Sequence, residues 1–221
     1  MLLVKPSFKI LTTDFVGMLE RIEAAGRTCY KSEAKAGPGT AASFVHKIIE
    51  RGHESVLEHE SISVRFIIDR GVSHELVRHR IASFSQESTR YCTYSGGVTF
   101  VIPPWVALLP GERDGDEILR EWKQYLSTGP ELMWLLSMAR AEREYLDLLA
   151  YGWTPQQARS VLPNSLKTEI VMTANLREWR HVFRLRCSPA AHPQMREVMV
   201  RLAESLARIL PCVFDDLVGK K

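Results

Sequence analysis

The feature that most constrains the fold is the strict alternation of apolar and polar residues between Glu60 and Asp69. The apolar positions are Ile62, Val64, Phe66 and Ile68. A period of two is that of a strand with one buried face, so the segment predicts a half-buried β-strand. A second strand is expected over 98–102, and Pro103-Pro104 ends it.

Helical patterns dominate the rest of the chain. Thr13-Asp14 is an N-cap signal before an amphipathic segment, and a helix is expected over 43–51 with Gly52 at its C′ position. Thr154-Pro155 begins a shorter helix that Pro163 ends. Apolar residues at helical spacing also predict helices over 116–127, 131–151, 165–186 and 193–210.

Two irregular segments are expected between the strands. Gly71-Val72-Ser73 reads as a turn, with Ser73 capping a short helix through Val77. The polar segment 83–97 is rich in serine and predicts a binding loop. Together the elements predict one α+β domain over 1–221, with a small, mainly antiparallel sheet packed with long helices.

Composition restricts the function classes. The formal net charge of +3 is too small to indicate a nucleic-acid partner. The four cysteines include no CxxC pair, which favours a reducing cytosol over a zinc or disulfide framework. We find no signal-peptide pattern and no apolar run near the roughly 20 residues that span a bilayer, so a cytoplasmic protein without a membrane partner is expected.

The segment 78–91 carries the strongest chemical signal. Arg78, Arg80 and Arg90 are fixed cations that bind phosphate, and serine hydroxyls with the Gln86 amide can read a base or a sugar. An ordinary solvated basic loop is the alternative for any arginine trio. The order of residues in the whole segment favours a nucleotide site.

That order resembles the signature of flavin-dependent thymidylate synthases, in which Arg-His-Arg is followed after seven residues by Ser. Here Arg78-His79-Arg80 and Ser88 fit it. Other segments resemble the family from about residue 43 to 200. They are His53-Glu54-Ser55, Glu58-His59, Ser73 to Val77, Arg90-Tyr91, Arg159, Leu162-Pro163, Asn175-Leu176-Arg177, His181 and Leu185-Arg186.

The resemblance implies two sets of binding residues and no metal. The residues implied to contact FAD are Ser55, Arg78, His79, Arg80, Gln86, Asn175, Leu176, Arg177 and His181. The residues implied to hold dUMP are Glu75, Leu76, Val77, Arg78, Gln86, Glu87, Ser88, Thr89, Arg90, Arg159 and Arg186. Arg186 matches the catalytic arginine that favours ionisation of the uracil N3, since a permanent cation stabilises the anion.

The sequence departs from part of the family at several of these positions. Gln86-Glu87 replaces an acidic-apolar pair of some members, Glu75 replaces a glutamine, and His181 stands where others have asparagine. The register after Arg186 is open by about two positions, which leaves the role of His192 open. The role of His53 is open as well.

By the same resemblance, the activity expected is conversion of dUMP to dTMP with FAD, NADPH and methylenetetrahydrofolate. The resemblance also implies a homotetrameric fold whose active sites combine residues of several subunits. The alternatives are a non-catalytic flavin- or nucleotide-binding protein and an RNA-binding module. Neither a Rossmann nor a P-loop motif is present.

Neither a zinc site at the two histidines of 74–79 nor a nucleophile at Cys92 or Ser88 is expected. His74 and His79 are five residues apart, so on a helix they cannot share one zinc ion as a metalloprotease pair does. No base lies near Cys92 or Ser88 in the sequence to activate either as a nucleophile. We therefore expect a buried thiol at Cys92 and a hydrogen-bonding serine at Ser88.

Overall fold

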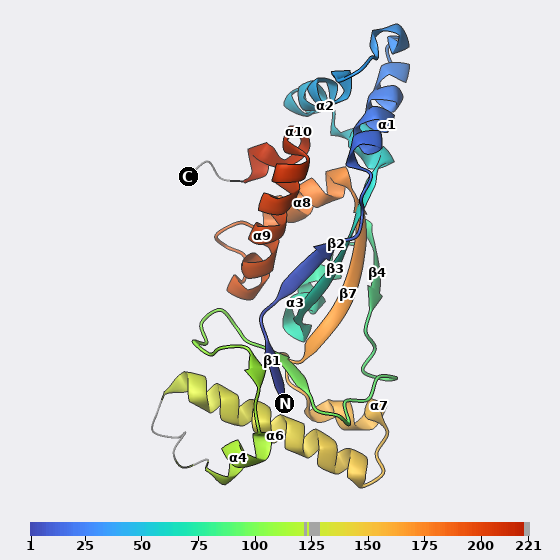
Figure 1. Ribbon diagram of the computed structural model, residues 1–221. Coiled ribbons are helices and arrows are strands. Elements are labelled where there is room, and N and C mark those ends of the chain that lie inside the picture. The colour runs from blue at the N-terminus through green and yellow to red at the C-terminus, as the bar shows by residue number, and fades with distance from the viewer. Residues whose placement is uncertain (122, 124–128, 219–221) are drawn as a thin grey trace. The chain divides into compact units, whose positions relative to one another are not determined.

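Strands and helices are mixed along the chain in the computed structural model, which describes residues 1–121, 123 and 129–218 (Figure 1). The chain divides into two compact units. The first comprises Met1–Ser7, Phe66–Arg78 and Ser85–Ile170. The second comprises Phe8–Arg65, His79–Phe84 and Val171–Lys221. The α+β class expected from the sequence is confirmed.

The strands form two small sheets. In the three-stranded sheet, β1 (Leu2–Val4) pairs in parallel with β5 (Thr99–Val101) and antiparallel with β6 (Gly111–Glu112). The order in the four-stranded sheet is β2-β3-β7-β4. Its strands are β2 (Ser7–Ile10), β3 (Ser61–Asp69), β7 (Lys167–Asn175) and β4 (Ala82–Gln86).

In the second unit, helices cover an aromatic core. Their bounds are α1 Phe15–Thr28, α2 Thr40–Glu50, α8 Leu176–Arg186, α9 Pro193–Ile209 and α10 Pro211–Phe214, with 3-10 turns at η1 Glu33–Lys35, η2 Glu54–His59 and η4 Asp215–Leu217. The Phe183 ring lies 5.6 Å from the rings of both Trp179 and Phe214. All three side chains are almost fully buried, so α8 is fixed along its inner face.

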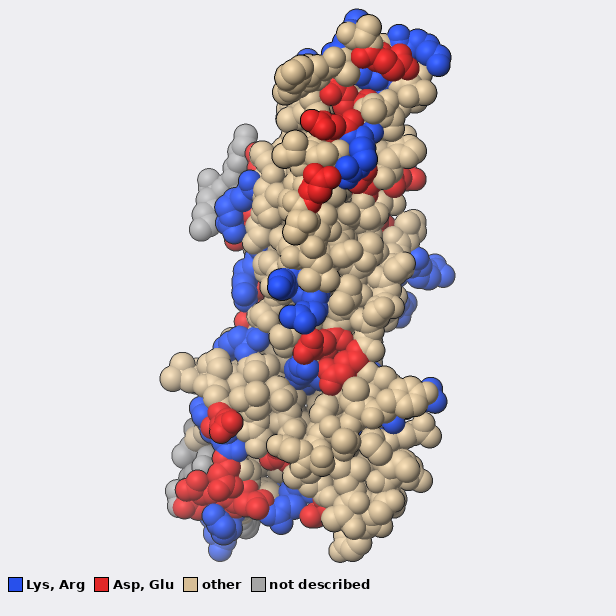
Figure 2. Space-filling model, turned by 45° about the vertical axis from the view of Figure 1, so that its right-hand side comes forward, with Lys and Arg blue, Asp and Glu red and all other residues tan. Residues whose placement is uncertain are grey.

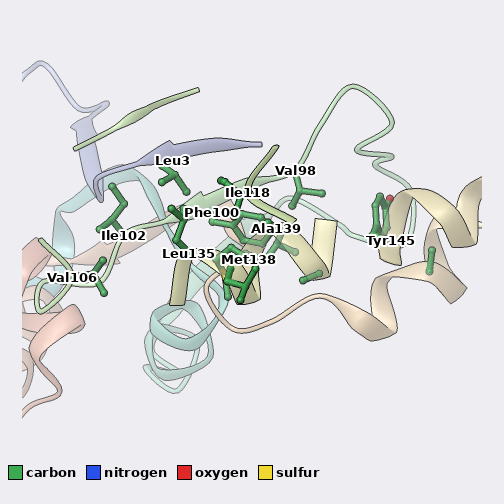
Figure 3. Close-up of a cluster of buried hydrophobic side chains, with 14 residues drawn as sticks. Leu3, Val98, Phe100, Ile102, Val106, Ile118, Leu135, Met138, Ala139 and Tyr145 are labelled. Carbon is green, nitrogen blue, oxygen red and sulfur yellow. The ribbon is translucent and has the colours of Figure 1, made fainter. Parts of the chain in front are cut away.

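The first unit has its core against a long helix, α6 (Pro130–Ala150). Figure 3 shows side chains of β1, β5 and α6 meeting there, among them Leu3, Phe100, Leu135 and Tyr145. The shorter helices of this unit are α3 Arg70–Leu76, α4 Gly115–Arg120, α7 Pro155–Ala158 and the 3-10 turn η3 Arg159–Val161.

Most of the expected elements are present. Asp14 caps α1, Gly52 follows α2 with φ of 72°, and Thr154 with Gln157 forms a capping box before α7. Strands β3 and β5 and helices α6 and α9 are confirmed. Of the helix expected over 116–127, α4 contains 116–120, whereas residues 122 and 124–127 lie outside the described part of the chain.

Three expectations are wrong. Residues 165–186 are not one helix, because Lys167–Asn175 is a strand whose residues alternate in burial, and only then does α8 begin. Gly71 to Ser73 is not a turn but part of α3, which Asp69 caps, not Ser73. The segment 83–97 is not wholly a loop, since its first residues belong to β4.

Within the described residues, no helix is both long and apolar enough to cross a membrane.

The cap of α3 generates a stability prediction. The buried Asp69 carboxylate accepts a hydrogen bond of 2.7 Å from the Val72 amide. We expect Asp69→Ala to lower the free energy of unfolding by about 0.5–2 kcal/mol in urea titrations, because the first turn of α3 loses its acceptor. Asp69→Asn, which keeps an acceptor oxygen, should retain most of the stability. Equal losses in both variants would contradict the capping role.

Candidate functional site

The junction of β7 and α8 organises a site in the second unit. The Asn175 side chain accepts a 2.8 Å hydrogen bond from the Glu178 amide, which ends the strand and begins the helix. Arg177 and His181 are exposed on the first turns of α8, whereas Glu178 is buried. Three residues expected to bind a cofactor are therefore set by one capped helix start.

His79 lies buried beside this helix, with only 5% of its surface exposed. Its Nδ1 is 3.2 Å from Oε1 of Glu178, and its Nε2 accepts a 3.0 Å hydrogen bond from Nε of Arg186. The His181 ring packs edge-on against it at 5.9 Å. The structure thus brings together His79, His181 and Arg186, as expected, and adds Glu178, which the sequence reasoning missed.

The surroundings keep the His79 ring neutral. Burial, together with the charges of Arg186 and His181, lowers the pKa of His79 to about 4. Burial also raises the pKa of Glu178 above its ordinary value, which His181 partly opposes. A neutral imidazole beside an arginine leaves the guanidinium charge available to an anion.

A pocket of about 480 Å³ opens at the start of α8. Its lining residues are Glu54, Glu58, Ile81, Asn175, Arg177, Glu178, His181 and Arg184. The volume lies within the usual range for ligand sites. Arg177 forms an ion pair with Glu58 at 2.5 Å, and Arg184 forms one with Glu54 at 2.8 Å.

The chemistry of this pocket suits part of a flavin nucleotide. The exposed Ile81 offers an apolar surface, and the arginines and His181 offer donors to an anion. An entering phosphate would compete with Glu58 for Arg177 and with Glu54 for Arg184. Arg80 is exposed, and its side chain has no ion pair or hydrogen bond within the described residues.

A second group lies in the first unit, on the segment that follows β4. Arg159 at the start of η3 donates from Nη1 to Oγ1 of Thr89 at 2.9 Å. Arg90 donates from Nε to Oε1 of Gln156 at 3.1 Å and lies over the Tyr91 ring at 5.3 Å. Arg159 therefore lies beside Thr89, although the two residues belong to segments far apart in the sequence.

The side chain of Glu87 is anchored inside this unit. Its carboxylate accepts hydrogen bonds of 2.9 Å from the Tyr94 hydroxyl and from Nζ of Lys167, and one of 3.1 Å from the Glu169 amide. These partners, with Lys167 the strongest, lower the pKa of Glu87 against the effect of burial. The Glu87 side chain therefore anchors its loop to Lys167 and Glu169 of β7 and to Tyr94.

Gln86 is anchored in a similar way. Its amide nitrogen donates to Oγ of Ser73 at 2.9 Å and to Oγ1 of Thr168 at 3.2 Å. The side-chain oxygen remains as the group that a ligand could reach. Ser88 is half-buried as well, and its Oγ accepts a hydrogen bond from the Arg90 amide at 3.3 Å.

The remaining expected residues differ in accessibility. Leu76 at the end of α3 and Leu176 at the start of α8 are fully buried, so only their backbones could meet a ligand. Glu75 is half-buried, while Val77 and Arg78 at the end of α3 are exposed in the first unit. Ser55 and His53 are exposed at η2, and His192 is exposed before α9; the lining of the 480 Å³ pocket includes none of the three.

The cysteine expected to be buried is exposed. Cys92 lies on the surface of the first unit, so the expectation of a buried thiol is wrong. The Tyr91 amide and the Cys92 amide both donate to the Ser88 carbonyl, which makes a turn there and leaves the Cys92 side chain outside the core.

A metal ion is a further ligand to consider at His79. His79, Glu178 and His181 offer ligand atoms within 4.8 Å of one another, and these residue types bind zinc. Both ring nitrogens of His79, however, already face hydrogen-bonding partners, Glu178 and Arg186. A metal would have to displace one of them.

The surface charge gives no comparable signal. On the face drawn in Figure 2, basic and acidic side chains are interspersed among uncharged ones. Such a mixed surface differs from the basic stripe that is typical of nucleic-acid binding.

Comparison with known proteins identifies the family of the chain. Residues 11–212 match the family model described as thymidylate synthase complementing protein. A flavin-dependent thymidylate synthase of Mycobacterium avium is 36% identical over 93% of this chain and 82% of its own. The enzyme of Mycobacterium tuberculosis H37Rv is 37% identical over the same shares.

Solved structures share the fold. Thymidylate synthase X from Helicobacter pylori, determined with FAD and dUMP, has a TM-score of 0.73 at 24% identity, covering 97% of this chain and 99% of its own. The UMP/dUMP methylase PolB from Streptomyces cacaoi, bound with 5-Br dUMP, has a TM-score of 0.70 at 23% identity, covering 97% and 96%.

The fold and the match to the family model define an α+β protein of the thymidylate synthase complementing class. More particularly, the chain belongs to the family of flavin-dependent thymidylate synthases.

The buried His79 generates a pH prediction. Its ordinary pKa is 6.5 and its folded-state pKa is about 4, so the unfolded chain binds the proton first as the pH falls. The contribution of His79 to stability is therefore complete above pH 6.5 and declines from there towards pH 4, by roughly 1–3 kcal/mol. In histidine-labelled protein, we expect the His79 resonance to titrate near pH 4, with His79→Gln identifying the signal. Titration near pH 6.5 would contradict the buried neutral ring.

Proposed function

We propose that this protein is a flavin-dependent thymidylate synthase that converts dUMP to dTMP, with methylenetetrahydrofolate as carbon donor and NADPH as reductant. The observation that carries the proposal is the gathering of His79, Asn175, Arg177 and His181 at the start of α8. These residues come from distant parts of the sequence, and the family resemblance assigns all four to FAD. They lie beside a pocket whose donors suit an anionic nucleotide.

FAD would be held mainly by residues of the second unit. Ser55, Arg80, Arg177 and His181 would donate to it, and Asn175 would keep the helix start in place; Leu176 would contribute through its backbone. Arg78 and Gln86 of the first unit are assigned to FAD by resemblance alone. When bound and reduced by NADPH, FAD supplies the hydride of the reductive methylation.

The chain's own contribution to the chemistry is positioning and charge. Arg90 and Arg159 would bind the phosphate of dUMP beside the hydroxyls of Ser88 and Thr89, since guanidinium groups recognise phosphate. Glu75, Leu76, Val77 and Arg78 would border the nucleotide, and Glu87 would support its loop. Arg186 would lie against the uracil and favour the N3 anion, which activates the base.

Several finer features belong to the proposal as well. They are a homotetramer with active sites shared between subunits, one functional domain over 1–221, folate and NADPH as partners, and a cytoplasmic location. The family resemblance supports them. Sedimentation of the purified protein tests the assembly, with a species of four chains expected and a stable monomer contradicting it.

The flavin itself provides the first test. Purified protein reconstituted with FAD should show flavin absorption, and NADPH oxidation should depend on dUMP and yield dTMP. Protein that binds no FAD would refute the proposal. Flavin binding without dUMP-dependent turnover would identify a non-catalytic flavoprotein instead.

Arg186 provides the residue test. We expect Arg186→Ala to weaken dUMP binding roughly 30-fold or more, because a guanidinium in contact with an anion contributes at least about 2 kcal/mol. FAD affinity should be largely retained. Arg208→Ala, which removes an exposed arginine of α9, is the matched control and should leave both affinities unchanged. Unaltered dUMP affinity in Arg186→Ala would refute the assignment.

A further inference from the structure

The side chains of Arg186 and Glu178 contact the two nitrogens of the same imidazole ring, that of His79. Arginine is a donor only, so the 3.0 Å contact between its Nε and Nε2 of His79 requires that Nε2 carry no proton. In a neutral imidazole the proton then sits on Nδ1, which faces Oε1 of Glu178 at 3.2 Å. The donors therefore run in one direction, from guanidinium to imidazole to carboxylate.

The burial of His79 and Glu178 fixes the direction of these hydrogen bonds. His79 is 5% exposed and Glu178 8% exposed, so neither can readily exchange its partner for water. A protonated His79 would place an N–H against the Nε–H of Arg186, and an inverted tautomer would do the same. Each would leave a buried donor without an acceptor, which costs about 1–3 kcal/mol.

We infer that Glu178 is a positioning residue for the nucleotide site: by accepting a hydrogen bond from the Nδ1–H group of His79, it leaves the unprotonated Nε2 to orient the guanidinium of Arg186. The inference rests on the proposed function insofar as Arg186 binds the uracil. Its chemical core, the tautomer of His79, does not depend on any ligand.

The position of Glu178 supports a role beyond helix capping. In a capping box, an acid three residues after the N-cap turns back to the N-cap amide. Asn175 accepts from the Glu178 amide, which is one half of that arrangement. The Glu178 carboxylate contacts His79 instead of the N-cap amide, so its side chain serves the site and not the helix cap.

The tautomer is measured first, in protein without ligand. Two-bond proton–nitrogen correlation spectra of ¹⁵N-histidine-labelled protein should show His79 protonated at Nδ1, with His79→Gln identifying the signals. Glu178→Gln keeps an acceptor oxygen and should keep this tautomer. Glu178→Ala should shift it towards a mixture. A wild-type ring protonated at Nε2, or a tautomer unchanged in Glu178→Ala, would overturn the inference.

The consequence for the nucleotide is measured second, in FAD-loaded protein by calorimetric titration with dUMP. Glu178→Ala should weaken dUMP about tenfold, or about 1.4 kcal/mol, whereas Glu178→Gln should stay close to wild type. In the Arg186→Ala background, Glu178→Ala should add nothing. Additive losses there would show that Glu178 acts independently of Arg186 and would overturn the positioning role.

The controls separate this inference from the proposed function. Glu117→Ala removes an exposed first-turn acid of α4 and should change neither the tautomer nor dUMP affinity. If wild-type protein bound no dUMP, the proposed function would fail while the tautomer measurement still decided the role of Glu178 at His79. If wild type bound dUMP and Glu178→Ala bound it equally well, only the positioning role would fail.

Discussion

One imidazole ring links the first turn of α8 to its last turn. His79 contacts Glu178 near the start of the helix and Arg186 at its end, and it belongs to a different segment of the chain, 79–84. The ring can make both contacts only while it is neutral, because the arginine approaches as a donor. The arrangement of the second unit's site therefore depends on a buried, uncharged histidine.

The helix itself is held by strong interactions on its other faces. Trp179 and Phe183 are buried, and the Trp179 indole donates to the Ile62 carbonyl at 3.0 Å. Arg180 is 1% exposed and binds the Asp216 carboxylate through two nitrogens at 2.7 Å, while Glu54 accepts from its Nε. A buried charge with such partners fixes geometry more than it adds stability. It leaves α8 little freedom to rotate, so Arg177 and His181 stay at the pocket.

Much of the fold could be predicted from local pattern, where one face of an element is buried. The alternation that predicted β3 reflects a sheet strand with one covered face, and Asp14 signalled the start of α1 by its chemistry. The strand 167–175 was missed because its residues suit a helix as well, and the distinction depends on pairing with β3 and β4, which is not local. The sequence pattern extends the strand to Asp69 and so hides that residue as a candidate cap for the following helix. The Asp69 carboxylate instead accepts from the Val72 amide.

The candidate site divides in the same way. The family-like order of residues predicts which side chains belong to the site. Arg159 and Thr89, two of those residues, are in contact in the structure. Nothing in the order indicated Glu178, since an Asn-x-x-Glu sequence at a helix start already has an explanation in capping. The residue order also did not indicate that Lys167 and Tyr94 donate hydrogen bonds to the Glu87 carboxylate. Such supporting residues are visible only when side chains are placed, because their role is defined by the residue they hold.

The direction of α8 adds a last constraint on where the negative charges of ligands can lie. The start of a helix carries a partial positive charge and its end a partial negative charge. An anion near Asn175 is therefore favoured by the helix, but one near Arg186 is opposed by it. A uracil anion at the C-terminal end of α8 would need a full cation to overcome the carbonyl dipoles. A neutral His79 leaves the positive charge of the Arg186 guanidinium intact. The low pKa of His79 and the position of Arg186 in the last turn are thus parts of one electrostatic arrangement.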